Sequence, residues 1–383
     1  MQNDLSKSHD RMKMMYKLKG KHDIKKKQKN YSIKKNEKKR RREEELLSSA
    51  INKESYQKAI EMQPTSGFNT NIQTQKKWYQ LSVALPGSIL NNAQSPELKA
   101  YLAGEIARSL SVFCVDEVVI FDETARMTDS QLNAYYSGSW TGEEKMTDKN
   151  NECNFHLARI LEFLECPQYL RKALFPVQKP LKFAGILNPL DGMHHLRAND
   201  LHVPYREGIV LDRIVKEGKG SFCDVGLDKE LQLEDGIVLP PKTRVTVHLT
   251  DTNPERKRYR GKIFSPKKIR NEAGVYWGYN VRLAKSLHDV FSIKYDVYVG
   301  TSERGKAIGD VEFEQKEGCK ILIVFGGLQG LEQAVQCDEQ IEDEDPASLF
   351  NYYINSLPDQ GSRIIRTEEA IPITLTALKM KLG

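Results

Sequence analysis

Paired cysteines and long apolar runs are both missing from this chain. Its six cysteines are scattered over 383 residues without a Cys-x-x-Cys pair, so neither zinc-ribbon spacing nor a redox pair is present. No apolar run approaches the ~20 residues that a membrane-spanning helix needs, and the N-terminus lacks the apolar segment of a secretory signal. Walker A, nucleophile-elbow and His-Glu-x-x-His motifs are absent as well. We expect an intracellular protein with reduced thiols, no membrane partner and no metal.

Positive charge is concentrated at the start of the chain. Residues 1–42 hold 17 Lys and Arg against four Asp and Glu, a balance of +13, while the other 341 residues hold 41 against 48, a balance of −7. Such basic blocks are typically disordered and bind phosphates or a nuclear import receptor. We therefore predict a basic, largely disordered tail and linker over 1–75 and a nuclear or nucleolar location. A tail that only keeps the protein soluble is the alternative.

Strand and helix patterns alternate from residue 76 to 184. A strand is predicted at 77–85, and Ser95 and Pro96 begin a helix that runs to about Val112. Residues 117–121 read as a second buried strand, and the polar residues 124–150 as a mobile insertion. Helices are expected at 154–164 and 168–174. This alternation predicts an α/β fold with a parallel sheet.

The periodicity changes over residues 185–275. Short β-branched segments at 207–215, 221–225, 244–249 and 259–263 are separated by turn signals, which predicts an inserted small β-barrel. Within it, residues 254–270 hold eight Lys and Arg against one acid, interleaved with Tyr259 and Phe264. Cations bind the phosphate backbone, and aromatic rings stack on unpaired bases.

We expect this insert to bind RNA, although a solvated, charged hairpin is the alternative. The candidate RNA-binding residues are Arg256, Lys257, Arg258, Tyr259, Arg260, Lys262, Lys267, Lys268 and Arg270. Upstream, His194 and His195 lie in a loop rich in turn residues. Adjacent histidines do not readily reach one ion, so we expect a loop that orders against RNA or the other domain rather than a metal site.

Three glycine-bearing loops mark the C-terminal part of the chain, at 300–305, 325–330 and 358–363. Two of them follow apolar runs, 295–299 and 321–325, that read as buried parallel strands. Loops at the carboxyl ends of such strands bind ligands in α/β folds, and glycine lets a ligand approach the backbone. We expect a small-molecule site there. The loops do not match Gly-x-Gly-x-x-Gly, which argues against a nicotinamide dinucleotide.

Charged and polar residues accompany these loops. Arg304, Arg363 and Arg366 offer guanidinium groups that clamp carboxylates or phosphates. Thr367 is expected to cap a terminal helix that has Glu368 and Glu369 in its first turn. Asn355 follows a predicted helical run at 349–354 and is either a ligand contact or a helix C-cap.

Two stretches, 325–332 and 361–370, resemble the SPOUT (α/β-knot) class of S-adenosylmethionine-dependent RNA methyltransferases. Residues 189–196, 277–282 and 300–305 are similar to one eukaryotic family of that class, the SPOUT-domain methyltransferase associated with the centromere and mitotic spindle. The resemblance covers about residues 76–380. It implies an α/β domain formed by 76–184 and 276–383, with a deep trefoil knot in its C-terminal part, and an OB-fold-like insert at 185–275.

The resemblance also implies S-adenosylmethionine as cofactor and a homodimer formed through the knot. The residues that it places around the cofactor are Thr301, Arg304, Phe325, Gly326, Gly327, Asn355, Ser356, Leu357, Gly361, Ser362 and Thr367. Arg304 and Arg363 are the expected stabilisers of negative charge on the substrate, and Glu368 is the candidate base.

The function that this resemblance implies is methylation of RNA, at N3 of a uridine in large-subunit ribosomal RNA. Mitotic spindle, centrosome and kinetochore association, with protein partners there, is a further expectation. The alternative is a non-catalytic RNA-binding or spindle scaffold protein that uses the knot to dimerise. The glycines in the C-terminal loops favour the enzyme.

Overall fold

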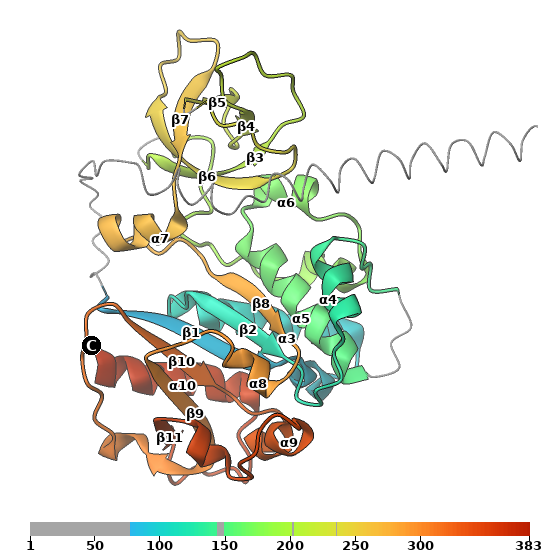
Figure 1. Cartoon of the computed structure of the whole chain (residues 1–383), viewed down its shortest axis with the longest axis vertical. Coiled ribbons are helices and arrows are strands. Elements are labelled where there is room, and N and C mark those ends of the chain that lie inside the picture. The colour runs from blue at the N-terminus through green and yellow to red at the C-terminus, as the bar shows by residue number, and fades with distance from the viewer. Residues whose placement is uncertain (1–76, 144–148, 201–202, 235) are drawn as a thin grey trace, which may run out of the picture. The chain divides into compact units, whose positions relative to one another are not determined.

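A computed structural model describes residues 77–143, 149–200, 203–234 and 236–383. The predicted basic tail lies outside the described residues. The centre of the fold is a six-stranded sheet in which every neighbouring pair of strands is parallel (Figure 1). Its strands, in order across the sheet, are β11 (Tyr352–Asn355), β9 (Val297–Ala307), β10 (Cys319–Val324), β1 (Tyr79–Pro86), β2 (Glu117–Phe121) and β8 (Asn280–Ala284).

The central strands are apolar because both faces of the sheet are covered. Seven of the eight residues of β1 are buried, as are all but the first residue of β2. Near-continuous burial of this kind is typical of parallel sheets with helices on both sides. Ala84 of β1 is level with Val324 of β10 and with Val119 of β2, so the carboxyl ends of these strands meet at one edge.

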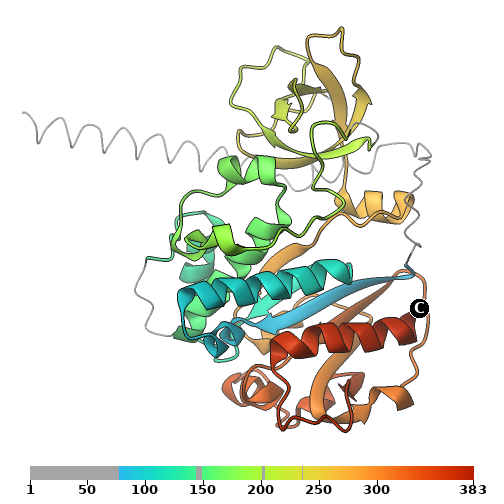
Figure 2. The same cartoon turned by 180° about the vertical axis from the view of Figure 1, so that it is seen from behind.

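Helices cover the two faces of the sheet unequally. Buried residues of α3 (Pro96–Val112), α5 (Lys149–Glu165) and α10 (Thr367–Leu382) share one hydrophobic core with the sheet. Figure 2 shows α3 and α10 crossing this face side by side. The shorter α8 (Leu287–Val290) and α9 (Gly330–Cys337) pack into the second core on the opposite face. The predicted start of α3 is confirmed, because the Ser95 side chain accepts a hydrogen bond from the Leu98 amide.

Two predictions of local structure were wrong and one strand was missed. The region 124–150 contains helix α4 (Asp129–Tyr136), whose first turn is capped by Thr128, and residues 144–148 lie outside the described range. The predicted helix at 349–354 is instead strand β11, because Tyr352, Tyr353 and Ile354 favour a strand and pair with β9. Edge strand β8 was not predicted.

The β-rich insert forms a closed five-stranded barrel, as predicted. Its strands, in order around the barrel, are β3 (Tyr205–Val210), β4 (Phe222–Asp224), β5 (Leu231–Leu233), β7 (Tyr259–Ile263) and β6 (Arg244–Asp251). All neighbours are antiparallel except β5 and β7. The three-residue β5 was not predicted. The barrel strands fall within the predicted domain 185–275, whose limits stay a prediction, as does the knot.

The remaining helical segments are short. They are α6 (Gln168–Leu174), α7 (Pro266–Lys268), η1 (Gly87–Asn92), η2 (Lys179–Leu181), η3 (Ala184–Ile186), η4 (Ile269–Ala273), η5 (Ile308–Asp310) and η6 (Pro346–Leu349). Of these, η1 follows β1 directly and therefore begins at the carboxyl edge of the sheet, where the glycine loops also lie.

A buried cluster of charged groups joins the barrel to helix α5. The Arg244 guanidinium lies 2.6 Å from Oε2 of Glu165 and 2.7 Å from Oε2 of Glu207. The imidazole of His194 is 3.0 Å from Oε1 of Glu165. Burial disfavours ionisation of Glu165, but Arg244 and His194 outweigh burial and hold the pKa of Glu165 well below its usual range. Arg244 and the ionised Glu165 thus join strand β6 to helix α5.

Candidate active site

A cavity of about 400 Å³ lies where β9, β10 and β11 reach the edge of the sheet. Its wall is formed by residues 301–304, 325–330 and 354–357, with further residues from 360–374. The first two segments fall in the predicted glycine loops 300–305 and 325–330, whereas 354–357 precedes the third loop, 358–363, from which Gln360 lines the cavity. The volume lies in the range of ordinary small-molecule sites.

The first segment is extended rather than a loop, which corrects the prediction for 300–305. Strand β9 continues to Ala307, but its pairing with β11 jumps from Gly300 to Lys306 between the adjacent partners Tyr353 and Ile354. The five residues between them therefore bulge away from the ladder. The Thr301 hydroxyl donates to the Val324 carbonyl at 3.2 Å, which holds the bulge against the end of β10.

The second segment connects β10 to α9 and depends on glycine at two positions. A Cβ on Gly326 would lie 2.6 Å from the carbonyl carbon of Gly330, and one on Gly327 would lie 2.1 Å from Oε2 of Glu123. Real Cβ atoms do not approach other heavy atoms so closely, so a side chain at either position requires the loop or its neighbours to move. The loop thus presents bare backbone to the cavity.

Helix α10 anchors this glycine loop. The Thr367 hydroxyl donates to the Gly326 carbonyl at 2.9 Å. Thr367 is therefore not the helix cap that the sequence suggested. The cap position is Arg366, whose amide donates to the Glu369 carboxylate at 3.0 Å.

The third segment is tied to the first by Asn355. Its side-chain amide donates to the Glu303 carbonyl at 2.9 Å, and its Oδ1 accepts from the Leu357 amide at 3.0 Å. Asn355 ends strand β11, so the alternative of a helix C-cap is wrong. Ser356 lies 2.7 Å from the Thr374 hydroxyl, which brings α10 into the same wall.

Nine of the eleven predicted cofactor residues line the cavity; Gly361 and Ser362 are exposed and do not. The three predicted catalytic residues differ in where they lie relative to the cavity. Arg304 lines the cavity, with its guanidinium 3.3 Å from Glu332, whereas Arg363 is exposed and outside the lining. The carboxylate of Glu368 accepts from the side-chain amide of Asn92 at 3.2 Å. The roles of all these residues stay predictions.

One acidic residue near the cavity was missed by the sequence reasoning. Glu123 lies two residues beyond the end of β2 and is 5% exposed. Its carboxylate lies close to Gly327, with Oε2 2.1 Å from where a Cβ on that residue would be. The available signal was its position just after a buried parallel strand, the same signal that identified the glycine loops.

The predicted RNA-binding residues of the barrel differ in how far their side chains are exposed to solvent. Tyr259 is 4% exposed and its hydroxyl donates to Asp228 at 2.7 Å, and Phe264 is also buried. Both rings are thus buried rather than open to a base, and Phe264 packs in a cluster with Tyr205, Ile269 and Trp277. Arg256 pairs with Asp251 at 2.7 Å.

The other predicted cations lie mostly at the surface of the insert. Lys257, Arg260 and Lys267 are exposed, while Arg258, Lys262 and Lys268 are half-buried. The guanidinium of Arg258 lies 4.5 Å from the centre of the Phe222 ring. Several positive charges thus remain exposed on this part of the chain.

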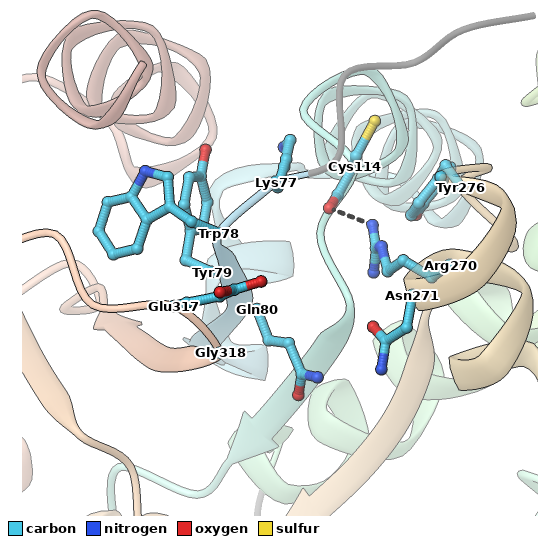
Figure 3. Close-up of a pocket in the computed structure, with 11 residues that line it drawn as sticks. Lys77, Trp78, Tyr79, Gln80, Cys114, Arg270, Asn271, Tyr276, Glu317 and Gly318 are labelled. Carbon is cyan, nitrogen blue, oxygen red and sulfur yellow. Dashed lines mark hydrogen bonds between the residues drawn. The ribbon is translucent and has the colours of Figure 1, made fainter.

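Arg270 faces inward, into a second cavity of about 210 Å³ at the amino-terminal ends of β1 and β10 (Figure 3). Its guanidinium donates to the Cys114 carbonyl at 2.9 Å, pairs with Asp116 and stacks 4.8 Å from the Tyr276 ring. The ammonium of Lys77 donates to the Phe113 carbonyl at 3.1 Å. Both cations therefore bind the carbonyls that follow α3, where the helix dipole is negative.

The paired histidines contact helix α5. Nε2 of His194 and Nε2 of His195 each lie 2.7 Å from the Glu165 carbonyl oxygen.

Within the part of the chain that the structure describes, no group of three or more His, Cys, Asp or Glu side chains is placed to hold a metal ion. The helices of that same part are all too short or too polar to cross a bilayer.

Comparison with known proteins gives consistent matches. A model of the family described as "Putative RNA methyltransferase" matches residues 80–378. The chain is 50% identical over 307 residues to a mouse protein named "28S rRNA (uridine-N(3))-methyltransferase", covering 79% of this chain and 76% of the mouse protein. A human protein of the same name is also 50% identical over 307 residues, covering 79% of this chain and 78% of the human protein. The matched family region contains all three segments of the 400 Å³ cavity.

Proposed function

Because the chain belongs to the RNA methyltransferase family whose model spans residues 80–378, we propose that it transfers a methyl group from S-adenosylmethionine to RNA. The observation that carries this proposal is the convergence of three chain segments on one cavity at the carboxyl edge of a parallel sheet. Such edges are where α/β proteins bind nucleotide-like ligands.

The residues of the cavity fit S-adenosylmethionine. Gly326 and Gly327 leave backbone, rather than side chains, against the ligand, and about 400 Å³ is within the range of a nucleoside-sized site. Thr301, Asn355 and Thr367 hold the three segments together. When bound, S-adenosylmethionine supplies an electrophilic methyl group on a positively charged sulfur.

We propose N3 of a uridine in large-subunit ribosomal RNA as the methyl acceptor, supported by the names of the mouse and human relatives. That nitrogen must lose its proton, so a group that stabilises the resulting negative charge speeds the reaction. Arg304 suits this role among the predicted residues because it lines the cavity and carries a fixed positive charge. The protein's main contribution is to hold the acceptor nitrogen in line with the methyl group.

We further propose that the barrel cations and the basic tail capture the RNA and that two chains pair through the knot. The location proposed is nuclear or nucleolar, with spindle, centrosome and kinetochore association as a separate property. Deleting residues 1–45 and measuring both nuclear accumulation and RNA affinity distinguishes import from RNA capture. A change in only one of the two measurements assigns the tail to that role.

The first test is calorimetric titration of the purified chain with S-adenosylmethionine, beside a Gly327→Trp variant. Micromolar binding to the wild type and its loss in the variant support the cavity as the cofactor site. Methyl transfer to a large-subunit RNA fragment, compared with the same fragment carrying N3-methyluridine at the candidate position, then tests the acceptor. A folded wild type that binds no S-adenosylmethionine contradicts the proposal and favours an RNA-binding scaffold.

A further inference from the structure

The second cavity, of about 210 Å³, lies at the opposite edge of the sheet from the candidate active site (Figure 3). Its wall is formed by the first residues of β1, the two residues before β10, Cys114 and residues that follow α7. Strand β1 has eight residues, so its two ends lie roughly 25 Å apart. The volume is below the ~300–1,000 Å³ of an ordinary small-molecule site. This cavity is therefore separate from the cofactor cavity and suits one part of a larger ligand.

Arg270 presents a flat and fixed surface to this second cavity. Its guanidinium stacks 4.8 Å from the Tyr276 ring, donates to the Cys114 carbonyl and pairs with Asp116. Tyr276 is itself held, because its hydroxyl donates to the Val115 carbonyl at 2.9 Å. Figure 3 shows Tyr276 on one side of the guanidinium and the residues of β1 on the other. Arginine planes of this kind stack on unpaired RNA bases.

Two carboxamide side chains line the same cavity. Gln80 of β1 is half-buried and Asn271 is exposed, and neither side chain is hydrogen-bonded to another residue that the structure describes. Figure 3 shows them on opposite walls. A carboxamide both donates and accepts hydrogen bonds, as the edge of a nucleobase requires. The cavity thus combines a stacking plane with hydrogen-bonding groups that the fold itself does not use.

Lysines lie on the wall of the cavity and beside it. Lys77 lines the cavity. Burial is the main cause that lowers the pKa of Lys77, and the positive charge of Lys379 contributes, so these two cations lie close together. Lys267 and Lys316 are exposed and come shortly before lining residues in the sequence. Glu317 also lines the cavity and has an interaction of its own. Exposed lysines of this kind bind the phosphates of a nucleic acid.

We infer that the second cavity binds one unpaired nucleotide of the RNA substrate, with the base on the Arg270 guanidinium and its edge against Gln80 and Asn271. This inference rests on the proposed function. It adds an RNA contact at the edge of the sheet away from the cofactor cavity. The cavity also adjoins the end of the basic segment 254–270, which supplies the candidate phosphate contacts. Duplex RNA keeps its bases stacked within the helix and therefore does not fill the cavity.

The test compares the affinity of the full chain for a single-stranded RNA oligonucleotide of mixed sequence with its affinity for the blunt duplex of that sequence. In the double variant Gln80→Ala, Asn271→Ala we expect single-strand binding to weaken roughly tenfold and duplex binding to stay unchanged. The matched control is the double variant Asn133→Ala, Gln336→Ala. It removes two exposed carboxamides that do not line the cavity and should keep both wild-type affinities.

The ratio of the two affinities separates base recognition from other effects. An unchanged ratio in the Gln80→Ala, Asn271→Ala variant overturns the inference, whether both affinities stay the same or both fall equally. The urea midpoint of this variant should match that of the wild type, because neither carboxamide is bonded to the described chain. If the midpoint falls, Asn271→Ala alone, at an exposed position, is judged by the same ratio. A wild type that binds neither S-adenosylmethionine nor RNA overturns the proposed function itself, which is a different result from an unchanged ratio.

Discussion

Arg244 on barrel strand β6 bonds to Glu165, the last residue of helix α5, through two guanidinium nitrogens, at 2.6 Å and 3.1 Å from the two carboxylate oxygens. The same guanidinium reaches Glu207 on the neighbouring strand β3. Trp277, which follows the barrel in sequence, donates to Glu207 at 2.8 Å. Helix α5, which precedes the barrel in sequence, and Trp277, which follows it, thus contact the same cluster of charged side chains.

Arg244→Met should lower the free energy of unfolding by about 3–5 kcal/mol, because it leaves the carboxylates of Glu165 and Glu207 buried without their cation. Urea denaturation measures this loss. The matched control is Arg213→Met, which breaks an ion pair of the same 2.6 Å length with Glu230, a carboxylate that is 30% exposed against 7% for Glu165. That change should cost about 1 kcal/mol or less. Equal losses in the two variants would contradict the account.

Stability should fall as the pH is lowered from about 6.5 to about 4. Burial is the main cause that lowers the pKa of His156 and of His195 to about 4, from an ordinary value of 6.5. Between these pH values the unfolded chain binds more protons than the folded chain, so acid favours unfolding. Glu165, whose pKa is held low, adds a further loss at still lower pH, as it becomes protonated.

Urea midpoints measured across this pH range check the prediction. His195→Gln removes one of the two titrating histidines and should make the dependence shallower. A midpoint that stays constant between pH 7 and pH 4.5 would show that neither histidine is kept neutral by the fold.

Gly327 and Gly361 were both predicted to contact the cofactor, but replacing each with alanine should affect cofactor binding differently. Gly327→Ala should weaken S-adenosylmethionine binding, since its Cβ meets Oε2 of Glu123 at 2.1 Å and either that carboxylate or the loop must move. Gly361→Ala should bind nearly normally, because a Cβ there meets no atom within 4 Å and Gly361 does not line the cavity. Calorimetric titration of both variants with S-adenosylmethionine measures the two affinities. An equal loss of affinity in both variants would contradict the prediction.

Removing two exposed cations of the insert should weaken RNA binding in a salt-dependent way. Lys257 and Lys267 are both exposed. Each lost phosphate contact reduces the slope of log affinity against log salt by about 0.7 for single-stranded RNA. The Lys257→Gln, Lys267→Gln double variant should therefore show a slope shallower by about 1.4. Lys294→Gln, an exposed lysine outside the barrel, is the control; an equal change there would argue against a specific surface.

The sequence predicted strands and caps well where local signals were strong. Ser95 and Pro96 marked the start of α3, and Glu117–Phe121 was recognised as a buried strand from its apolar run alone. The glycines of 325–330 indicated a ligand-binding loop because they come directly after an apolar run that reads as a buried strand. The C-terminal segment 352–355 was harder, because four residues cannot show a period and only pairing with β9 makes them a strand.

Contacts between distant residues were beyond the reach of sequence patterns. Glu123 and Gly327 are about two hundred positions apart in the sequence. The residues around Glu123 give no sign that its carboxylate contacts this glycine in the fold. Tyr259 shows the opposite failure. Its basic neighbours suggested an exposed ring, but the alternation of strand β7 turns it into the barrel. Which face of a strand is buried depends on the partner strands.

The order of strands across the sheet has a consequence for synthesis on the ribosome. Central strand β1 needs β10, residues 319–324, as its neighbour, and the cavity wall is finished only by Thr374 of α10. All barrel strands are translated before then, by Ile263. At roughly 5–20 residues per second, the nascent chain spends on the order of ten seconds between these points. A newly made chain thus completes its barrel strands before it completes the cavity.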